Sequence, residues 1–131
     1  MAITTVTYTN SKAYVGKTRQ PMADIALLGP ARRFPVLGVL VDTGADLLQV
    51  PANAAASAGF PLGAGTKIPI GTAGGKATMI LLSGVVVEIE GIRVTTDLLC
   101  HPNPGSRPLL GRAALAALVA YGFDAVNWVW V

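Results

Sequence analysis

The segment Val39–Asp46 reads VLVDTGAD, and it carries the most information about how this chain folds. An apolar run leads directly into Asp42, which is followed by a hydroxyl residue, a glycine, an alanine and a second acid, Asp46. An ordinary tight turn between strands, such as Asp-Gly, would leave its carboxylate in water. Here the apolar run predicts a partly desolvated carboxylate. Burial of an unpaired charge costs on the order of several kcal/mol, so Asp42 is expected to have a partner or a chemical role.

Length and composition predict one domain, residues 1–131, with an excess of apolar surface. The chain has 131 residues, of which 52% are hydrophobic and only 13% are charged. Apolar side chains that a domain of this size cannot bury are expected to lie in a subunit interface or to line a groove. The longest apolar runs, Met79–Val87 and Ala113–Gly122, are shorter than the roughly 20 residues of a membrane-spanning helix. No membrane span is therefore expected.

The distribution of charge and cysteine argues against several classes of protein. The net charge is +3 and the ten basic residues are scattered, with Arg32-Arg33 as the one adjacent pair, so nucleic-acid binding is not expected. Cys100 is the single cysteine, which excludes an internal disulfide and a cysteine-rich metal site. Residues Met1–Thr5 lack the basic and apolar segments of a signal peptide, and a cytoplasmic protein is expected.

Short strand-like segments dominate the chain, which predicts an all-β, closed, barrel-like fold with one or two short helices. Strands are expected at Ile3–Tyr8, Met22–Leu28, Pro35–Val41, Leu47–Val50, Thr66–Thr72, Lys76–Leu82, Val85–Ile89, Ile92–Leu99 and Phe123–Val131. Helices are expected at Ala52–Ala58 and Leu109–Tyr121, each followed by a glycine. Glycines at the tip of the Thr66–Leu82 segment predict a hairpin.

A second motif, PLLGRAAL at Pro108–Leu115, accompanies the first. An apolar strand into Asp-Thr-Gly-Ala-Asp, a glycine-tipped hairpin about thirty residues later, and Leu-Leu-Gly-Arg at the start of a helix near the C-terminus form an ordered series. This series resembles the retropepsin-like aspartic proteases, the retroviral type of aspartic endopeptidase. The resemblance runs from about Pro35 to Tyr121, nearly the whole chain.

The resemblance implies that Asp42 is the catalytic aspartate and that Thr43 and Gly44 complete the active-site loop. In the family the threonine hydroxyl bonds to the opposite loop across a dimer axis, and the glycine lets the backbone approach the carboxylates. Hydrolysis of a peptide bond needs a base to activate water and an acid to protonate the substrate. Two carboxylates about 3 Å apart cannot both ionise, so they share one proton and supply both functions. No metal or cofactor is required.

The resemblance also implies supporting roles near this loop. Asp46 is expected to pair with Arg112, and Ala45 and Asp46 are expected to help hold a bound peptide. A bidentate pair between arginine and carboxylate fixes geometry well. The chain departs from the family pattern at Ala113, where Asp or Asn usually braces the start of the helix.

The hairpin and the second motif are expected to contact substrate. Gly74 and Gly75 would form the tip of the flap that closes over an extended peptide. Leu109 is the best candidate for a pocket lining, with Leu40 and Ile70 as further candidates. Apolar residues are therefore expected around the scissile bond.

One chain carries a single Asp-Thr-Gly, and this count predicts a homodimer. No second Asp-Thr-Gly or Asp-Ser-Gly is present, so a dyad requires Asp42 from each of two chains related by a two-fold axis. The closing segment Asn127–Val131, together with the Thr-rich N-terminus, is a candidate for an interface sheet.

Three other interpretations are open from the sequence. The chain could be a catalytically inactive peptide-binding or dimerisation module that keeps the fold. It could be a membrane-surface or assembly protein, which its apolar composition favours. Asp42 could be a hydrogen-bonded turn carboxylate and the glycines at the hairpin tip a plain turn.

Overall fold

The computed structural model describes residues 5–72 and 75–131, and β-strands make up most of this region. The elements in chain order are β1 (Asn10–Ala13), β2 (Met22–Leu28), β3 (Arg33–Val41), β4 (Leu48–Pro51), α1 (Ala52–Ala58), the 3-10 turn η1 (Leu62–Ala64), β5 (Thr66–Thr72), β6 (Gly75–Ile89), β7 (Ile92–His101), β8 (Leu109–Leu110), α2 (Arg112–Leu115), β9 (Tyr121–Phe123) and β10 (Asn127–Trp130). The predicted all-β class with two short helices is confirmed. No helix in the described ranges is both long and apolar enough to cross a bilayer.

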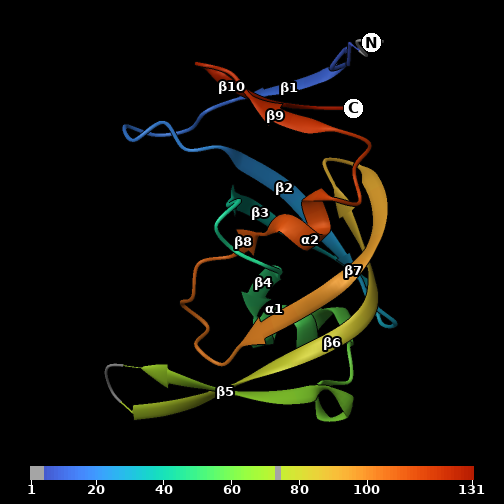
Figure 1. The fold of residues 1–131 in the computed structure, drawn as a ribbon. Coiled ribbons are helices and arrows are strands. Elements are labelled where there is room, and N and C mark those ends of the chain that lie inside the picture. The colour runs from blue at the N-terminus through green and yellow to red at the C-terminus, as the bar shows by residue number, and fades with distance from the viewer. Residues whose placement is uncertain (1–4, 73–74) are drawn as a thin grey trace, which may run out of the picture.

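Seven strands form a curled sheet that closes on itself (Figure 1). Their order is β2-β3-β8-β4-β7-β6-β5, and β2 pairs a second time with β6, where Leu27 lies opposite Val87. The 15 residues of β6 allow both contacts: its first half pairs with β5 in a hairpin and its second half pairs with β2. The ring of strands is closed by β2 and β6, and the β5–β6 hairpin projects from it.

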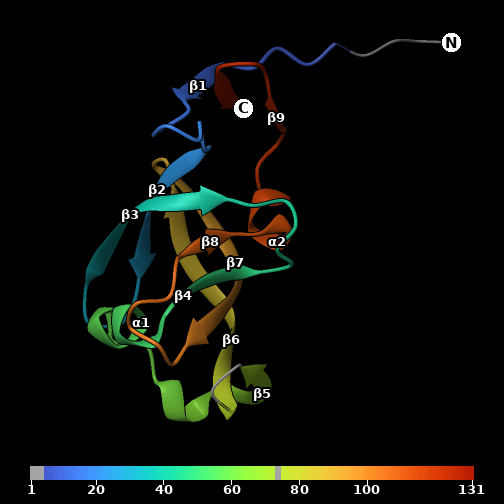
Figure 2. The same ribbon diagram turned by 90° about the vertical axis from the view of Figure 1, so that its left-hand side faces the viewer.

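Three strands from the two ends of the chain form a separate sheet, which we call the terminal sheet. β10 lies in the middle, with β1 on one edge and β9 on the other. The two views place the terminal sheet at the end of the molecule opposite the β5–β6 hairpin (Figures 1 and 2).

Two tryptophans attach the terminal sheet to the barrel. Trp128 is fully buried, and its indole Nε1 donates a hydrogen bond of 2.9 Å to the carbonyl oxygen of Met22. Trp130 stacks on it with ring centroids 4.2 Å apart. Aromatic burial with a satisfied indole N–H is a strong packing contact. Both tryptophans are therefore core residues within one chain.

The barrel interior is filled with aliphatic side chains, as the alternation of apolar residues predicts. Its fully buried members include Ala23, Leu27, Val39, Leu48, Val50, Val87, Ile89, Leu98 and Leu110. The predicted helix Ala52–Ala58 is confirmed, and Gly59 ends it in the left-handed conformation with φ of 91°.

Several predicted elements are wrong in extent. The expected strand Phe123–Val131 is interrupted at residues 124–126, which separate β9 from β10, and the expected strands Lys76–Leu82 and Val85–Ile89 form one continuous strand, β6. The expected helix Leu109–Tyr121 is reduced to Arg112–Leu115. At one end Leu109 and Leu110 pair with Leu40 and Val41 of β3, and at the other end Tyr121 pairs with Trp130 of β10. Sheet pairing here overrides helix propensity. The expected strand Ile3–Tyr8 is also wrong over residues 5–8, which are not in a strand; the N-terminal strand is β1, and residues 3–4 lie outside the described range.

Lys12 joins β1 of the terminal sheet to the barrel through two carboxylates. Its Nζ lies 2.9 Å from Asp24 Oδ2 and 2.6 Å from Glu90 Oε1, and its side chain is 29% exposed. Burial tends to lower the pKa of Lys12, but the hydrogen bonds and charges of Glu90 and Asp24 outweigh it and raise the pKa. The pKa of Asp24 is lowered, first by the Gly38 N–H and then by Lys12. This cluster should stabilise the attachment of the terminal sheet at neutral pH.

We expect Lys12→Met to lower the free energy of unfolding at pH 7 by about 1–3 kcal/mol, because it leaves Glu90 without its cation. A lowered carboxyl pKa contributes stability above the ordinary value of about 3.9 and loses it as pH falls through the folded value. The difference between the two proteins should therefore shrink below about pH 4. Urea unfolding at pH 7 and pH 3 measures this. Lys17→Met, at an exposed lysine in a turn, is the control, and an equal loss in that variant would contradict the assignment.

Candidate active site

Asp42 lies one residue beyond the end of β3, in a turn fixed by the backbone. Its N–H donates to the carbonyl oxygen of Leu110 at 3.0 Å, which holds it against β8. Its carbonyl oxygen accepts from the N–H of Ala45 at 3.1 Å. The N–H of Gly44 donates to Asp42 Oδ1 at 2.9 Å. The carboxylate is therefore oriented by the loop Asp42–Ala45, and it is half-buried.

The seven acidic residues of the chain have different partners, and Asp42 is one of three without an ion pair among the described residues. Four form ion pairs: Asp24 and Glu90 with Lys12, Glu88 with Arg33, and Asp46 with Arg112. Two accept backbone N–H groups: Asp97 in β7 from Gly84 in β6, and Asp124 from Val126 and Asn127 in the turn before β10. Within the described residues, Asp42 has no ion pair, and Gly44 engages one of its two oxygens. A half-buried carboxylate with one oxygen free is suited to proton transfer.

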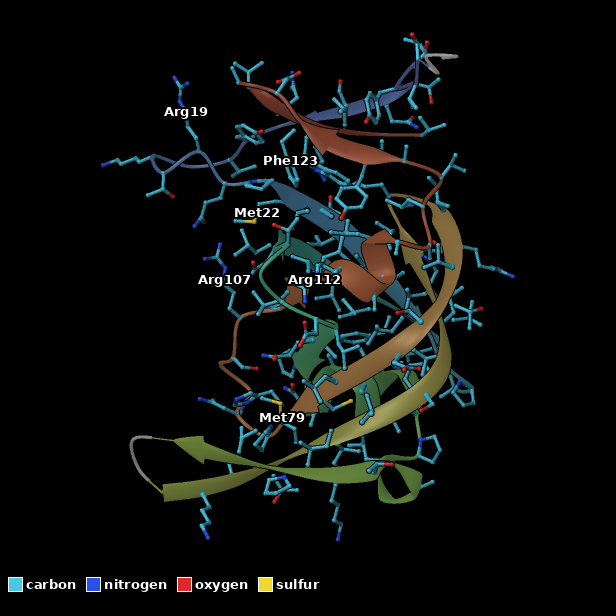
Figure 3. The ribbon with its side chains drawn as sticks, viewed as in Figure 1. Arg19, Met22, Met79, Arg107, Arg112 and Phe123 are labelled. Atoms are coloured by element: carbon cyan, nitrogen blue, oxygen red, sulfur yellow. The ribbon has the colours of Figure 1, made fainter. Side chains whose placement is uncertain are left out.

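Arg112 supports the loop from the start of α2. Its guanidinium donates through Nη2 to the carboxylate of Asp46 and through Nη1 to the carbonyl oxygen of Thr43, the latter at 2.7 Å. Figure 3 shows its side chain between α2 and the loop that follows β3. The structure thus brings together Asp46 and Arg112, as the resemblance implies, but through one guanidinium nitrogen and one carboxylate oxygen. The contact to Thr43 adds a second point of attachment, because a planar guanidinium can serve two acceptors at once.

The backbone of α2 completes this attachment. The N–H groups of Arg112 and Ala113 donate to the carbonyl oxygens of Ala45 and Asp46, both at 2.9 Å. The first N–H groups of a helix have no partner within the helix. The loop therefore caps α2, and the helix start is braced even though Ala113 carries no polar side chain.

Gly111 makes this close approach possible. A Cβ atom at this position would lie 2.4 Å from the carbonyl oxygen of Leu47 and 2.7 Å from its backbone nitrogen. Only glycine leaves room for two backbone segments at such a distance. The Gly-Arg pair therefore combines a backbone contact with a charged side-chain contact.

The remaining predicted site residues lie in two regions. Leu109 is half-buried in β8 beside Leu40 of β3, so two of the expected pocket residues are neighbours. Ile70 lies in β5, which β4, β7 and β6 separate from β8 in the sheet order. Gly75 begins β6 with φ of 128°, paired in register with Thr72. Gly74 lies outside the described residues.

The loop is open in a single chain. Thr43, Gly44 and Asp46 are exposed, and a cavity of about 580 Å³ found elsewhere, between η1 and β6, is not lined by them. In both views the loop after β3 and the free end of the β5–β6 hairpin lie on the same side of the molecule (Figures 1 and 2). One subunit thus presents a carboxylate and a hairpin on a common side without enclosing them.

Sequence reasoning missed two parts of the molecule, one in this site and one on a surface outside it. Leu110 holds Asp42 through its carbonyl oxygen, and a backbone contact of this kind has no sequence signal. The second part is a set of exposed apolar side chains, which we call the terminal patch: Val6, Tyr8, Val15, Val119, Phe123 and Val126. The sequence signal for the terminal patch is the presence of apolar residues among polar ones near both ends of the chain. In the described residues, Leu37 is the one other large hydrophobic side chain classed as exposed.

Comparison with known proteins agrees with this geometry. A family model described as "gag-polyprotein putative aspartyl protease" matches residues 35–117, well over half of the chain. No curated protein matches the chain. The matched range contains the Asp42 loop, the β5–β6 hairpin and the Gly-Arg start of α2. The chain belongs to the retropepsin-like aspartyl protease family of gag polyproteins.

Proposed function

We propose that this protein is an aspartic endopeptidase that acts as a two-fold homodimer, with Asp42 of each subunit forming the catalytic dyad. The observation that carries the proposal is the state of Asp42. It is half-buried, is held by the Gly44 N–H through one oxygen, and belongs to a loop braced by Arg112. Membership of the protease family supports the same role.

The dyad would hydrolyse a peptide bond by general acid–base catalysis. Two Asp42 carboxylates brought close together would share one proton, because both cannot ionise at short range. The ionised partner takes a proton from water, and the water oxygen attacks the peptide carbonyl carbon. The protonated partner donates to the carbonyl oxygen, and a proton then passes to the leaving nitrogen. Activity should favour mildly acidic pH, since the shared proton must be kept.

The terminal patch supports the homodimer. Its six residues come from the segments 6–15 and 119–126, which flank or form the terminal sheet. The two segments meet where the Tyr14 N–H donates to the Val126 carbonyl oxygen at 3.0 Å. Exposed apolar side chains that lie close together are typical of a protein–protein contact. Contact between two copies through this region would cover the patch. The Thr43 hydroxyl is exposed in one subunit and would be available to the opposite loop.

The β5–β6 hairpin is proposed to close over an extended peptide as a flap. A peptide in the strand conformation would use backbone hydrogen bonds, and alternate side chains would enter pockets. Leu40 and Leu109 are half-buried neighbours close in sequence to Asp42 and Arg112, and they are candidates to contact apolar residues at the scissile bond.

Cleavage of defined peptides by the purified full chain tests the proposal. A mixture of peptides with varied apolar pairs is incubated at pH 5 and pH 8, with and without pepstatin, and the products are identified by mass spectrometry. We expect cleavage between apolar residues that is faster at pH 5 and blocked by pepstatin. A folded dimer that cleaves no peptide would instead support an inactive peptide-binding module.

A further inference from the structure

The barrel has a gap along one edge of β6. Leu81 is the last residue of β6 that pairs with β5, opposite Thr66, and Val87 is the first that pairs with β2, opposite Leu27. Between them, residues 82–86 have β7 on one side and no paired strand on the other in the described sheet. A register shift between Leu82 and Val85 bends β6 at this point.

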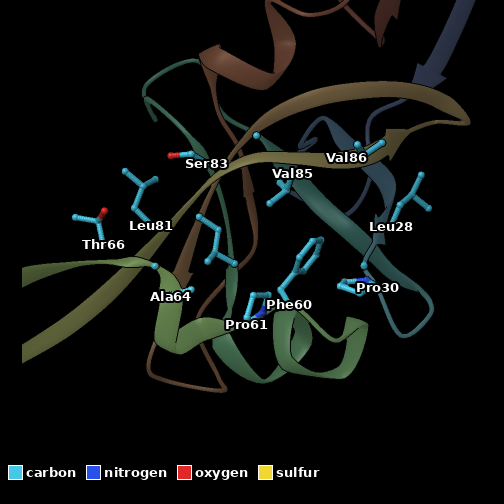
Figure 4. A pocket seen from close by; sticks show the side chains of 14 residues that line it. Leu28, Pro30, Phe60, Pro61, Ala64, Thr66, Leu81, Ser83, Val85 and Val86 are labelled. Carbon is cyan, nitrogen blue, oxygen red and sulfur yellow. The ribbon is translucent and has the colours of Figure 1, made fainter.

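An apolar cavity of about 580 Å³ fills this gap. Its wall is made by the end of β2, the segment around η1 and the bent part of β6. Figure 4 shows Phe60 projecting among Leu28, Pro30, Val85 and Val86. Small-molecule sites in proteins are mostly apolar and typically measure about 300–1,000 Å³. The cavity is thus of the size and character that takes a small ligand.

A second cavity, shallow and open to solvent, adjoins the first, and basic side chains line it. The two share Leu28, Gly29, Pro30 and Val86 as lining residues. The second adds the side chains of Arg32, Arg33 and Arg93, all of them exposed. The apolar cavity therefore opens beside three guanidinium groups.

Most of this positive charge is not neutralised within the described residues. Arg33 forms an ion pair with Glu88 at 3.1 Å. Glu88 also lies opposite Arg93 in the pairing of β6 with β7. Arg32 and Arg93 form no ion pair in the part of the chain that the structure describes. Three cations and one acid leave an excess of positive charge next to apolar walls. Arginine binds carboxylates in a planar, two-point geometry.

We propose that the two cavities form one binding site for an anionic amphiphile, a linear alkyl chain that ends in a carboxylate. The alkyl chain would occupy the gap beside β6 and contact Phe60, Val85 and Val86. The carboxylate would lie at Arg32 and Arg93. Burial of an alkyl chain gives a favourable free energy, and the guanidinium groups supply the charge that a carboxylate needs. No bond is made or broken at this site.

The site is separate from the Asp42 loop and does not rest on the proposed peptidase activity. It borders the base of the β5–β6 hairpin through Ala64, Thr66 and Leu81. Binding should therefore change the amide chemical shifts at the base of the hairpin more than those of residues near Asp42.

Titration of the full chain with decanoate tests the proposal, with decanol and decyltrimethylammonium as matched probes. Amide chemical shifts by NMR report the site and calorimetry reports the affinity. We expect decanoate to shift residues 28–33, 60–66 and 81–86, and to bind at least 10-fold more tightly than decanol. The ammonium probe should bind more weakly than both. Equal binding of decanoate and decanol, or no binding of decanoate, would overturn the proposal.

Variants locate the two halves of the site. Arg32→Gln with Arg93→Gln should weaken decanoate at least 10-fold and leave decanol unchanged. Ala64→Trp, at an exposed position that lines the apolar cavity, should fill the cavity and weaken the binding of both decanoate and decanol. Thr66→Trp fills the same cavity and replaces the first variant if that one folds poorly. Arg19→Gln, at an exposed turn residue that lines neither cavity, is the control. If the folded tryptophan variants bind decanoate as tightly as the unchanged protein, the ligand binds at another site. Repeating the titration with Asp42→Asn keeps the result independent of peptidase activity.

Discussion

Asp42→Asn is expected to lower kcat/KM for peptide cleavage by at least about 1,000-fold, because an amide can neither accept a proton from water nor share one with its partner. The fold should be kept. An asparagine side-chain oxygen can still accept the Gly44 N–H that now meets Asp42 Oδ1 at 2.9 Å. Cleavage of a fluorogenic peptide gives the rate, and sedimentation gives the assembly state.

Asp97→Asn is the matched control for this change. Asp97 also accepts a backbone N–H, that of Gly84 at 3.2 Å, and it forms no ion pair among the described residues. The control should retain peptidase activity within about 3-fold, as expected for a distant and independent site. Full activity in Asp42→Asn would remove Asp42 from the mechanism, whatever the family suggests.

The double variant Phe123→Lys with Val126→Lys is expected to dissociate the dimer. These side chains are 46% and 56% exposed in one subunit, so lysine should be tolerated by the monomer fold. In a two-fold contact each substitution acts twice and would place lysines from the two copies in one apolar patch. A loss of about 3 kcal/mol or more is expected, equivalent to at least about 100-fold in the dissociation constant. Peptidase activity should fall with the dimer, since one chain supplies half of the dyad.

The comparison with Leu37→Lys distinguishes this result from a general effect of added charge. Leu37 is 71% exposed and lies in β3 of the barrel, outside the terminal patch. Its variant should stay dimeric and active in sedimentation and cleavage assays. A double variant that remained dimeric would exclude the terminal patch as the interface. Deletion of residues 127–131 is a less clean test, because it also removes buried Trp128 and its hydrogen bond to Met22.

Two contacts that hold the Asp42 loop differ in whether the sequence predicts them. The pairing of Asp46 with Arg112 could be predicted, because a family motif places an acid in one loop and an arginine at a helix start. The hydrogen bond from the Asp42 N–H to the Leu110 carbonyl oxygen could not be predicted. Every residue has a carbonyl, and only the register of β3 against β8 selects this one. The same pairing explains why Leu109 and Leu110 form a strand although their local pattern predicts a helix.

The terminal segments show the same division. Alternation at Trp128 and Trp130 predicts a strand with one buried face, and this is confirmed. The sequence could not say whether that face meets another subunit or the chain's own barrel. The structure packs both rings inside the chain and exposes Phe123 and Val126 instead. The interface proposal therefore moves from the segment Asn127–Val131 to the terminal patch.

By itself, the sequence determined the family, the all-β class and the acid that stands out, because these depend on residue types at short spacing along the chain. Tertiary structure alone decided the length of α2, the backbone bonds that orient Asp42, the burial of the tryptophans and the gap beside β6. Each of these depends on which distant strands become neighbours, and free energy gained by such contacts exceeds the local preferences that can be read along the chain.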